Sequence, residues 1–354
     1  MRYHKIGSTQ IEASVIGFGT WGIGGWMWGG VREADSIRAI HAAREHGINL
    51  IDTAPMYGLG RAEELVGKAI RGRRDAFVVA SKCGIPWDSK DWPAGKGNFH
   101  FHANDEGLSS AESKYRFYRY LNPDSIKREV EDSLRRLGTD HLDILLTHAQ
   151  EDTTPIADTM GALEELRAAG KVRAVGCSNV SLDQLHEYCR AGTLDVDQER
   201  FNLIDQHVRQ AGIIGACEQR QISFFAYSPL EHGLLSGKLR PDQEYPEHDF
   251  RRTSRQFSPR SVQRMNDVLA RLRPLAEEYS ATVAQVIVAW TIAQAEGCHA
   301  LCGIRSEAHV RENAVAGNIV LDRDACGRIE EVAHQGKIVL PRPKGVGAYL
   351  DSAP

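Results

Sequence analysis

The stretch Asn49-Leu-Ile-Asp-Thr-Ala-Pro-Met-Tyr-Gly-Leu-Gly60 carries the pattern around which the rest of the chain is organised. A short apolar run at 48–51 ends in the carboxylate of Asp52, and a turn rich in Pro and Gly then leads to Tyr57. This pattern predicts a buried strand that presents polar groups at the edge of a sheet. Alone, the pattern is also compatible with an ordinary strand end and loop, so the residues at the ends of the neighbouring strands are needed to distinguish a functional site from this alternative.

Outward from this stretch, short apolar runs alternate with segments of helical periodicity. We expect core strands at 15–19, 48–52, 77–82, 142–148, 172–178, 196–201, 222–227 and 300–303. We expect helices at 33–46, 61–70, 123–137, 154–169, 181–191, 210–220, 283–295 and 307–316. Repeated strand–helix units of this number favour an α/β fold of the (β/α)8 barrel type over a doubly wound sheet.

The remaining segments are expected to decorate one barrel. Residues 2–16 predict an N-terminal hairpin, and the chain shows no composition break, so 1–354 is interpreted as a single domain. Long insertions are expected at about 83–121 and 229–258, with a C-terminal tail at about 335–354. The first two follow strands, which places them at the barrel face where enzymes of this fold carry their sites.

Composition limits the functional class. Charged residues make up 25% of the chain and its formal net charge is −4, which argues against a nucleic-acid partner. No apolar run is long enough to span a bilayer, and the N-terminus lacks the apolar core of a signal peptide. The seven scattered cysteines form no Cys-x-x-Cys pair, so we expect a cytoplasmic protein without a disulfide framework or structural zinc.

The next two strands end in a lysine and a histidine. Lys82 closes the strand at 77–82, and His148 closes the strand at 142–148. The carboxyl ends of barrel strands meet at one rim, so both should lie near Asp52 and Tyr57. Each residue alone could be a solvated or hydrogen-bonded strand end, but together they indicate a reactive site.

These four side chains suit one kind of chemistry. A tyrosine of ordinary pKa, about 10, is a weak acid near neutrality, and a nearby ammonium lowers that pKa. Asp52 would hold Lys82 in place, and His148 would hold a carbonyl oxygen by a hydrogen bond. The set therefore predicts a site that polarises a carbonyl group and delivers a proton while hydride arrives at carbon.

The motifs resemble those of the aldo-keto reductase superfamily, in its bacterial NADPH-dependent branch, along nearly the whole chain. They are Asn49-x-Ile51-Asp52-Thr53-Ala54-x-x-Tyr57-Gly58, Glu63-Glu64-x-x-Gly67, Ser81-Lys82 and the strand ending in His148. The resemblance implies that Asp52, Tyr57, Lys82 and His148 are catalytic, with Tyr57 as proton donor. One departure is visible, because Ala149-Gln150 stands where many members have Trp-Pro, and this alters the expected pocket wall beside His148.

The resemblance also implies NADPH as cofactor. It assigns the amide of the nicotinamide to Ser178, Asn179 and Gln198, and a stacking contact to Tyr227. Arg305 at a helix start would hold the ribose 2′-phosphate. The full set of implied cofactor residues is Gly19, Thr20, Trp21, Asp52, Ser178, Asn179, Gln198, Tyr227, Ser228, Pro229, Leu230, Gly233, Leu235, Ser236, Gly303, Ile304, Arg305, His309, Glu312 and Asn313.

The sequence also contains a segment that looks like the glycine-rich fingerprint of a Rossmann dinucleotide site. The segment 17–22 satisfies Gly-x-Gly-x-x-Gly and follows a strand, but glycines and tryptophans occupy 24–30, where a dinucleotide fingerprint requires a helix. We therefore exclude a Rossmann site.

The tryptophans suggest a sugar-like substrate. Glycine-rich loops offer little core for a ring to fill, so these rings could stack on sugar faces. The expected substrate contacts are Trp21, Trp26, Trp28, Tyr57, Trp87 and His148, with Trp92 as a further ring in the long loop.

The first insertion also carries charged and polar side chains. Its candidates are His100, His102, Asn104, Asp105, Lys114, Tyr115, Arg116 and Arg119. Their cations could receive an anionic group, and the alternative is a polar lid with ordinary surface charge. No further ligands accompany the His100-x-His102 pair, so no metal is expected.

We therefore expect an enzyme of carbohydrate metabolism that reduces an aldehyde or ketone with NADPH. The favoured substrate is a sugar-derived aldehyde, such as a hexose with a non-anomeric aldehyde. The alternatives are NAD(P)-dependent oxidation of a sugar or polyol, and an NADPH-binding regulatory subunit that senses redox state. The chain could act as a monomer or a homo-oligomer.

Overall fold

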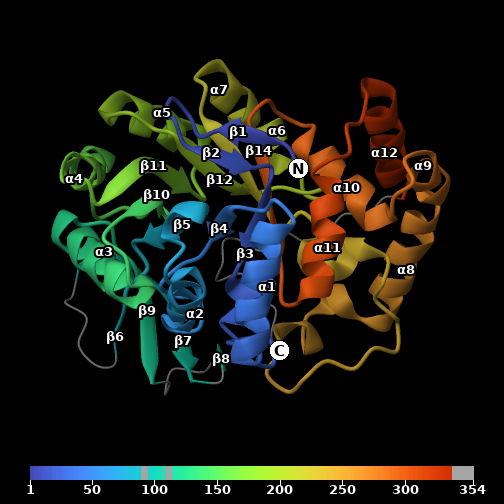
Figure 1. The fold of residues 1–354 in the computed structure, drawn as a ribbon, viewed down its shortest axis with the longest axis horizontal. Coiled ribbons are helices and arrows are strands. Elements are labelled where there is room, and N and C mark those ends of the chain that lie inside the picture. The colour runs from blue at the N-terminus through green and yellow to red at the C-terminus, as the bar shows by residue number, and fades with distance from the viewer. Residues whose placement is uncertain (89–94, 106, 109–113, 337–354) are drawn as a thin grey trace.

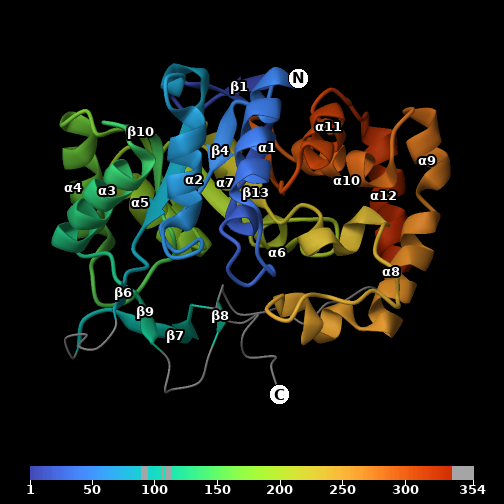
Figure 2. The same cartoon turned by 60° about the horizontal axis from the view of Figure 1, so that its bottom comes forward.

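The fold is that of a computed structural model, which describes residues 1–88, 95–105, 107–108 and 114–336. Eight parallel strands form a closed barrel that helices surround (Figures 1 and 2). The strands are β3 (Ile16–Gly19), β4 (Leu50–Asp52), β5 (Val78–Cys83), β10 (Leu142–Thr147), β11 (Val172–Ser178), β12 (Val196–Arg200), β13 (Ser223–Tyr227) and β14 (Cys298–Gly303). Parallel pairing of β14 with β3 closes the ring, which confirms the expected (β/α)8 barrel.

The helices around the barrel follow the expected order, with small shifts at their ends. They are α1 (Glu33–Glu45), α2 (Arg61–Ile70), α3 (Pro123–Leu137), α4 (Ile156–Ala168), α5 (Leu182–Ala191), α10 (Val283–Ile292) and α11 (Glu307–Ala316). The expected helix at 210–220 is instead two short helices, α6 (His207–Gln210) and α7 (Ile213–Gln219). Gly212 separates them because its φ of +84° cannot continue a helix.

Three further helices were not expected from the sequence. They are α8 (Pro259–Ala270), α9 (Arg273–Glu278) and α12 (Arg323–Gln335), which lie together at one side of the barrel in Figure 1. All three fall outside the strand–helix alternation on which the prediction rested. Among the described residues, no helix combines the length and apolar character that a membrane span requires.

The N-terminal hairpin closes the end of the barrel opposite the strand tips. It consists of β1 (Tyr3–Lys5) and β2 (Glu12–Ser14), as expected. Ile6 and Ile11 pack into one cluster with Leu50, Ile144 and Phe225, which point into the barrel. The hairpin thereby shields the lower layer of barrel side chains from water.

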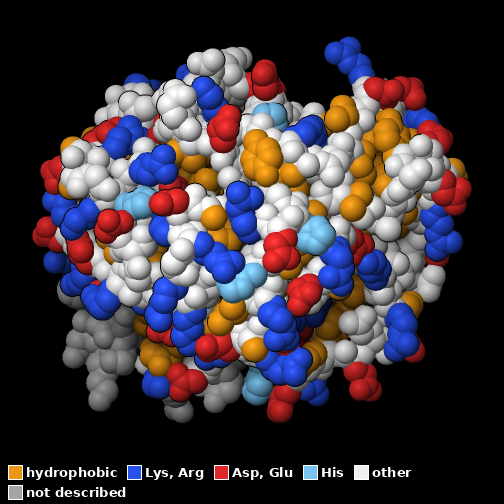
Figure 3. Space-filling view, viewed as in Figure 1, with side chains coloured by type: hydrophobic (Ala, Val, Ile, Leu, Met, Phe, Trp, Pro, Cys, Tyr) orange, Lys and Arg blue, Asp and Glu red, His pale blue; other side chains and the backbone are white. Residues whose placement is uncertain are grey.

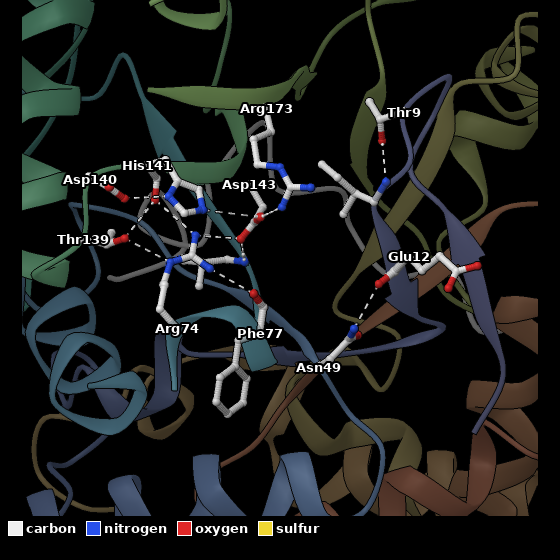
Figure 4. A network of polar contacts seen from close by, with 12 residues as sticks. Thr9, Glu12, Asn49, Arg74, Phe77, Thr139, Asp140, His141, Asp143 and Arg173 are labelled. Carbon is white, nitrogen blue, oxygen red and sulfur yellow. Dashed lines mark hydrogen bonds and ion pairs between the residues drawn. The ribbon is translucent and has the colours of Figure 1, made fainter. Parts of the chain in front are cut away.

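A polar network lies at the same end of the barrel and joins β5, β10 and β11 (Figure 4). Asp143, only 2% exposed, pairs with Arg74 at 2.7 Å and with Arg173 at 2.5 Å, and it accepts a hydrogen bond from the amide of Val79. Such pairing compensates the desolvation of a buried carboxylate. The charges satisfy one another, so we assign the network and the cavity of about 220 Å³ beside it to the structure of the barrel.

A small antiparallel sheet occupies the first insertion, where the sequence predicted only a long loop. Its strands are β6 (Trp87–Asp88), β7 (Asn98–Asn104), β8 (Gly107–Leu108) and β9 (Tyr115–Arg119), in the order β6-β9-β7-β8. Figure 2 shows this sheet at the same end of the barrel as the long segment that follows β13. The stacked rings of Phe101 and Phe117, 4.5 Å apart, form its packed face.

The segment after β13 forms three 3-10 helices before α8. They are η3 (Glu231–Ser236), η4 (Phe250–Arg252) and η5 (Arg255–Phe257). Trp28 forms an isolated antiparallel bridge with Asp249, so this segment lies against the glycine-rich loop after β3. On the face drawn in Figure 3, basic and acidic side chains are interspersed, in keeping with the small net charge of −4.

Candidate active site

The tips of β4 and β5 bring Asp52, Lys82 and Tyr57 into one hydrogen-bonded group. Lys82 Nζ donates to Asp52 Oδ1 at 2.7 Å, to the carbonyl of Thr53 at 2.9 Å and to Tyr57 Oη at 3.3 Å. The lysine is 1% exposed and the aspartate 4% exposed, so the ion pair is buried. All three donor positions of the ammonium are used, which fixes Lys82 beside the phenol.

His148 follows β10 and completes the group. Its ring lies edge-on to the Tyr57 ring, with centroids 6.0 Å apart, and its amide donates to the carbonyl of Cys83. Burial lowers the pKa of His148 well below its usual range, and the positive charges of Lys82 and Arg119 lower it further. A neutral imidazole carries one N–H, which can donate to a carbonyl oxygen without bringing a charge into the site.

The electrostatics of Tyr57 differ from the sequence-based expectation. We expected Lys82 to lower the pKa of the phenol, whereas burial and the negative charge of Asp52 raise it well above 10. Lys82 Nζ contacts both Asp52 and Tyr57, but burial of the phenol and the charge of Asp52 outweigh the charge of the ammonium. The consequence is that Tyr57 keeps its proton, which is the form that a proton donor needs.

Hydrogen bonds to helices α2 and α3 stabilise the strand end that carries Lys82. Ser81 Oγ donates to Glu63 Oε1 on α2 at 2.6 Å, and Arg136 Nε on α3 donates to Glu63 Oε2 at 2.6 Å. Glu63 is fully buried. The contact holds the end of β5 against two helices, and so limits the movement of Lys82.

The polar residues of β11 to β13 form a second connected group. Asn179 Nδ2 donates to the carbonyl of His148 at 2.8 Å and to Ser178 Oγ at 3.0 Å, and Tyr227 Oη donates to Asn179 Oδ1 at 2.8 Å. Gln198 Nε2 instead donates to Asp52 Oδ1 at 2.9 Å. Two of the implied amide contacts, Ser178 and Asn179, thus adjoin each other and the stacking residue Tyr227, while Gln198 belongs to the Asp52–Lys82 group.

The segment that follows Tyr227 has an unusual backbone. Ser228, Glu231, His232 and Gly233 have φ values of 56°, 47°, 53° and 97°, in the left-handed region that only glycine adopts without strain. A backbone of this kind turns successive amides in one direction, as phosphate-binding loops do.

A buried carboxylate, which the sequence reading missed, supports that backbone. Glu231 is fully buried and accepts from Arg200 at 2.6 Å, from Asn202 at 2.7 Å and from Gln256 at 2.7 Å. Burial would raise its pKa, but hydrogen bonding from His232 and the charge of Arg200 outweigh this and hold the pKa at about 2. The available signal was the charged Arg200 at the end of an otherwise buried strand.

The remaining residues of the implied cofactor set lie around the tips of β14 and β3. Gly303 pairs with Gly19, Ser306 caps α11, and Arg305 donates to the carbonyl of Gly30. The set continues with Trp21, Pro229, Leu230, Leu235, Ser236, Ile304, His309, Glu312 and Asn313. Arg305 is partly exposed beside the first turn of α11, where a helix N-terminus favours an anion.

The polar side chains at the strand tips fit a nicotinamide dinucleotide. Thr20 Oγ1 and Thr53 Oγ1 are buried with no hydrogen-bond partner in the described part of the chain, and both flank Asp52 in the strand tips. Side-chain amides at Asn179 and Gln198 offer both donors and acceptors to an amide ligand. A buried polar atom without a partner calls for one from a bound molecule or water.

The tryptophans are not equivalent. Trp21 lies 6.4 Å from the ring of Tyr57, and it also contacts Trp28, His232 and Phe250. Trp21 and Trp28 therefore sit in an aromatic cluster that joins the glycine-rich loop to the segment after β13.

Trp26 does not fulfil its expected role as an exposed stacking ring. It is 5% exposed, packs against both Phe101 and Phe117, and donates to the carbonyl of Asn104. The small sheet supplies the core that the loop by itself lacks. Trp87 also stacks on Phe117, and Trp92 lies outside the described residues.

The unusual residues after the histidine, Ala149 and Gln150, are both buried. Gln150 is 9% exposed and accepts from Tyr188 Oη on α5 at 2.7 Å, and Ala149 is buried. The departure from Trp-Pro thus removes a large side chain from this part of the rim and replaces it by contacts to α5.

Comparison with known proteins gives a consistent result. A family model described as the Aldo/keto reductase family matches residues 15–334. The chain is 37% identical over 332 residues to the NADH-specific methylglyoxal reductase of Escherichia coli (strain K12), covering 92% of this chain and 96% of that protein.

Two solved structures extend the comparison. The glycerol dehydrogenase of Gluconobacter oxydans superposes with a TM-score of 0.82 at 30% identity, over 96% of this chain and 98% of that one. An aldo-keto reductase from Klebsiella pneumoniae in complex with NADPH gives a TM-score of 0.66 at 27% identity, over 94% and 95% of the two chains.

Proposed function

Since the chain belongs to the aldo/keto reductase family and is an oxidoreductase of carbonyl and alcohol groups, we propose that it reduces a sugar-derived aldehyde or ketone with NADPH. The observation that carries this proposal is the contact of Lys82 Nζ with both Asp52 Oδ1 and Tyr57 Oη, beside a neutral His148. This geometry presents a proton and a hydrogen-bond donor to one oxygen atom.

Each residue of the group has a distinct part in that reaction. His148 donates a hydrogen bond to the substrate oxygen and orients it, and Tyr57 transfers its proton to that oxygen as negative charge develops there. Lys82 stabilises the phenolate that remains, and Asp52 holds the lysine in place. When bound, the nicotinamide cofactor supplies the hydride that the carbonyl carbon receives.

The electrostatics favour reduction over the reverse reaction. Oxidation of an alcohol would need Tyr57 as a base, and therefore as phenolate, whereas its raised pKa keeps the proton on the phenol. The protonated phenol is the form that carbonyl reduction uses, and we propose this reaction as the main direction.

The choice of NADPH rests on Arg305 at the start of α11 and on the relative whose structure contains NADPH. A guanidinium at a helix N-terminus matches the charge of a 2′-phosphate. The Escherichia coli relative is named NADH-specific, so the preference is a proposal for this chain. The sugar-derived substrate is proposed from the ring of Trp21 beside Tyr57.

The replacement Tyr57→Phe tests the proposal directly. It removes the proton while keeping the ring, so we expect kcat for aldehyde reduction to fall by roughly 10²–10⁴-fold. NADPH binding, followed by cofactor fluorescence, should stay within about twofold because Phe keeps the ring. Turnover near that of the unmodified enzyme would remove Tyr57 from the role of proton donor.

A further inference from the structure

The small sheet after β5 contains a bulge that redirects one histidine. Pairing of β7 with β9 shifts register between Phe99 and Phe101, so His100 is the additional residue. Bulges of this kind turn a side chain out of its alternating direction and are frequent beside active sites. The ring of His100 lies beside that of Phe101 on the packed face of the sheet, with centroids 4.7 Å apart.

Arg119, from the neighbouring strand β9, fixes the state of this histidine. Its Nη2 donates to His100 Nδ1 at 3.2 Å, so Nδ1 is an acceptor and the neutral ring carries its proton on Nε2. Burial, together with the charge of Arg119, lowers the pKa of His100 to about 3. The ring is therefore neutral at physiological pH and offers one N–H donor from Nε2.

Two donors of this pair have no partner among the described residues. His100 Nε2 and Arg119 Nε are both buried, and neither makes a hydrogen bond to any residue that the structure describes. A buried donor without a partner costs about 1–3 kcal/mol, so two in one place indicate that a ligand supplies the acceptor. Burial also lowers the pKa of Arg119, and the charge of Asp152 opposes this. Within the described residues, no ion pair joins the guanidinium to a carboxylate.

The small sheet that carries the pair lies against the loop that follows His148. The amide of Asp152 donates to Asn98 Oδ1 at 3.0 Å, and the amide of Gly97 donates to Thr153 Oγ1 at 2.8 Å. This sheet follows β5, the strand of Lys82, whereas most of the implied cofactor residues lie on or after β11 to β14 and β3. The unpaired donors are thus on the substrate side of the rim.

We propose that Arg119 and His100 bind an anionic oxygen group, a carboxylate or a phosphate, on the carbonyl substrate. This inference rests on the proposed function and narrows its substrate class. One charged and one neutral N–H donor match an anionic oxygen group, which accepts several hydrogen bonds and supplies the missing counter-charge. A substrate with hydroxyl groups alone would add no negative charge beside the guanidinium.

Matched pairs of aldehydes test the proposal. The probes are 4-oxobutanoate against butanal, for a carboxylate, and glyceraldehyde 3-phosphate against glyceraldehyde, for a phosphate. We expect kcat/KM of the unmodified enzyme to be at least about tenfold higher for one anionic member than for its neutral partner. The Arg119→Gln variant should lose that preference, because its kcat/KM should fall by a larger factor for the anionic aldehyde than for its neutral partner.

Two further variants serve as controls. Arg116 is an exposed arginine of β9 whose side chain points to the other face of the strand, so Arg116→Gln should leave both preferences unchanged. Arg119→Lys keeps the charge but not the Nε donor, and it should retain part of the preference. Cofactor binding by each variant shows that its barrel is folded.

The outcomes separate the two proposals. Equal kcat/KM for anionic and neutral aldehydes, or an equal loss for both in Arg119→Gln, overturns the anionic site while carbonyl reduction stands. Absence of reduction with all four aldehydes and with either NADPH or NADH overturns the proposed function itself. Equal loss of the anionic preference in Arg116→Gln and Arg119→Gln would also overturn the site, because it would indicate general surface charge.

Discussion

At the scale of single residues, the buried pair of Lys82 and Asp52 controls both chemistry and stability. Removing one member of a buried ion pair leaves an uncompensated charge, at a cost of about 3–5 kcal/mol. The lysine is 1% exposed, so water cannot replace it. We therefore expect Lys82→Met to lower the free energy of unfolding by about 3 kcal/mol and to abolish most of the reductase activity.

Urea denaturation at pH 7 measures this effect, and a second substitution separates its causes. Adding Asp52→Asn to Lys82→Met removes the stranded carboxylate, so stability should recover in part while activity does not. If Lys82→Met alone is as stable as the unmodified chain, the carboxylate of Asp52 must become hydrated or protonated in the variant.

The raised pKa of Tyr57 predicts opposite pH profiles for the two directions of reaction. Reduction uses the protonated phenol, so kcat/KM for an aldehyde should not rise between pH 7 and about 9. Oxidation of the corresponding alcohol needs the phenolate, whose fraction increases tenfold per pH unit below the pKa, so its kcat/KM should rise over the same range. An oxidation rate that is flat in pH would contradict this assignment.

How far single residues can be predicted depends on what fixes them. Asp52, Lys82 and His148 follow from the sequence because each ends an apolar strand, and parallel strands end at one rim. The burial of Trp26 could not be foreseen, because it depends on Phe101 and Phe117 in an insertion with no strand pattern. The direction of the pKa of Tyr57 depends on Asp52 and burial, which only coordinates provide.

At the scale of elements, β12 carries two buried acids on one strand. Asp197 accepts from the thiols of Cys177 and Cys217, and burial raises its pKa to about 7. Burial and the charge of Asp197 also raise the pKa of Glu199 well above its usual value. The two carboxyls disfavour each other's ionisation, so the strand holds protons that an unfolded chain would release.

This arrangement predicts how stability depends on pH. Between about pH 4, where unfolded Asp197 ionises, and about pH 7, the folded state holds the extra proton, so stability falls as pH rises and stays lower above pH 7. Asp197→Asn removes this ionisation. We expect the variant to be more stable at pH 8 by on the order of 2 kcal/mol, with a smaller difference at pH 4.

Urea denaturation at pH 4, 6 and 8 provides the test. Replacing Asp242, an exposed aspartate after η3, by Asn is the matched control and should leave the pH profile unchanged. Equal curves for Asp197→Asn and the unmodified chain would show that the carboxyl is charged and compensated in the folded state.

Elements were predictable where they repeat. Strands of a parallel barrel are buried on both faces, so they appear as continuous apolar runs between polar turns. The small sheet lacks this signal, because β6 and β8 are two residues each and β7 mixes His, Asn and Phe. Its packing depends on Trp26, which is distant in sequence, and no local pattern could reveal that contact.

At the scale of the whole molecule, the glycine-rich loop after β3 contacts both the small sheet and the segment after β13. Trp26 packs against the small sheet, and Trp28 bridges to Asp249 in the segment after β13. Arg305 at the start of α11 donates to Gly30 in the same loop. The small sheet, the segment after β13 and the start of α11 are therefore all in contact with residues 26–30 of one loop.

The preference for one cofactor can be measured as a shift in the melting temperature of the protein. Its implied binding residues come from distant parts of the barrel, so the cofactor should bind the folded chain alone. A ligand present at 100 times its Kd then stabilises the fold by about 2.7 kcal/mol, which raises Tm by a few degrees.

If Arg305 binds a 2′-phosphate, NADP⁺ should raise Tm more than NAD⁺ at equal concentration, and Arg305→Ala should abolish the difference. Arg311→Ala, on the exposed face of the same helix, should preserve it. Equal shifts with both cofactors in the unmodified chain would contradict a 2′-phosphate contact of Arg305, and a larger shift with NAD⁺ would indicate a preference for NADH.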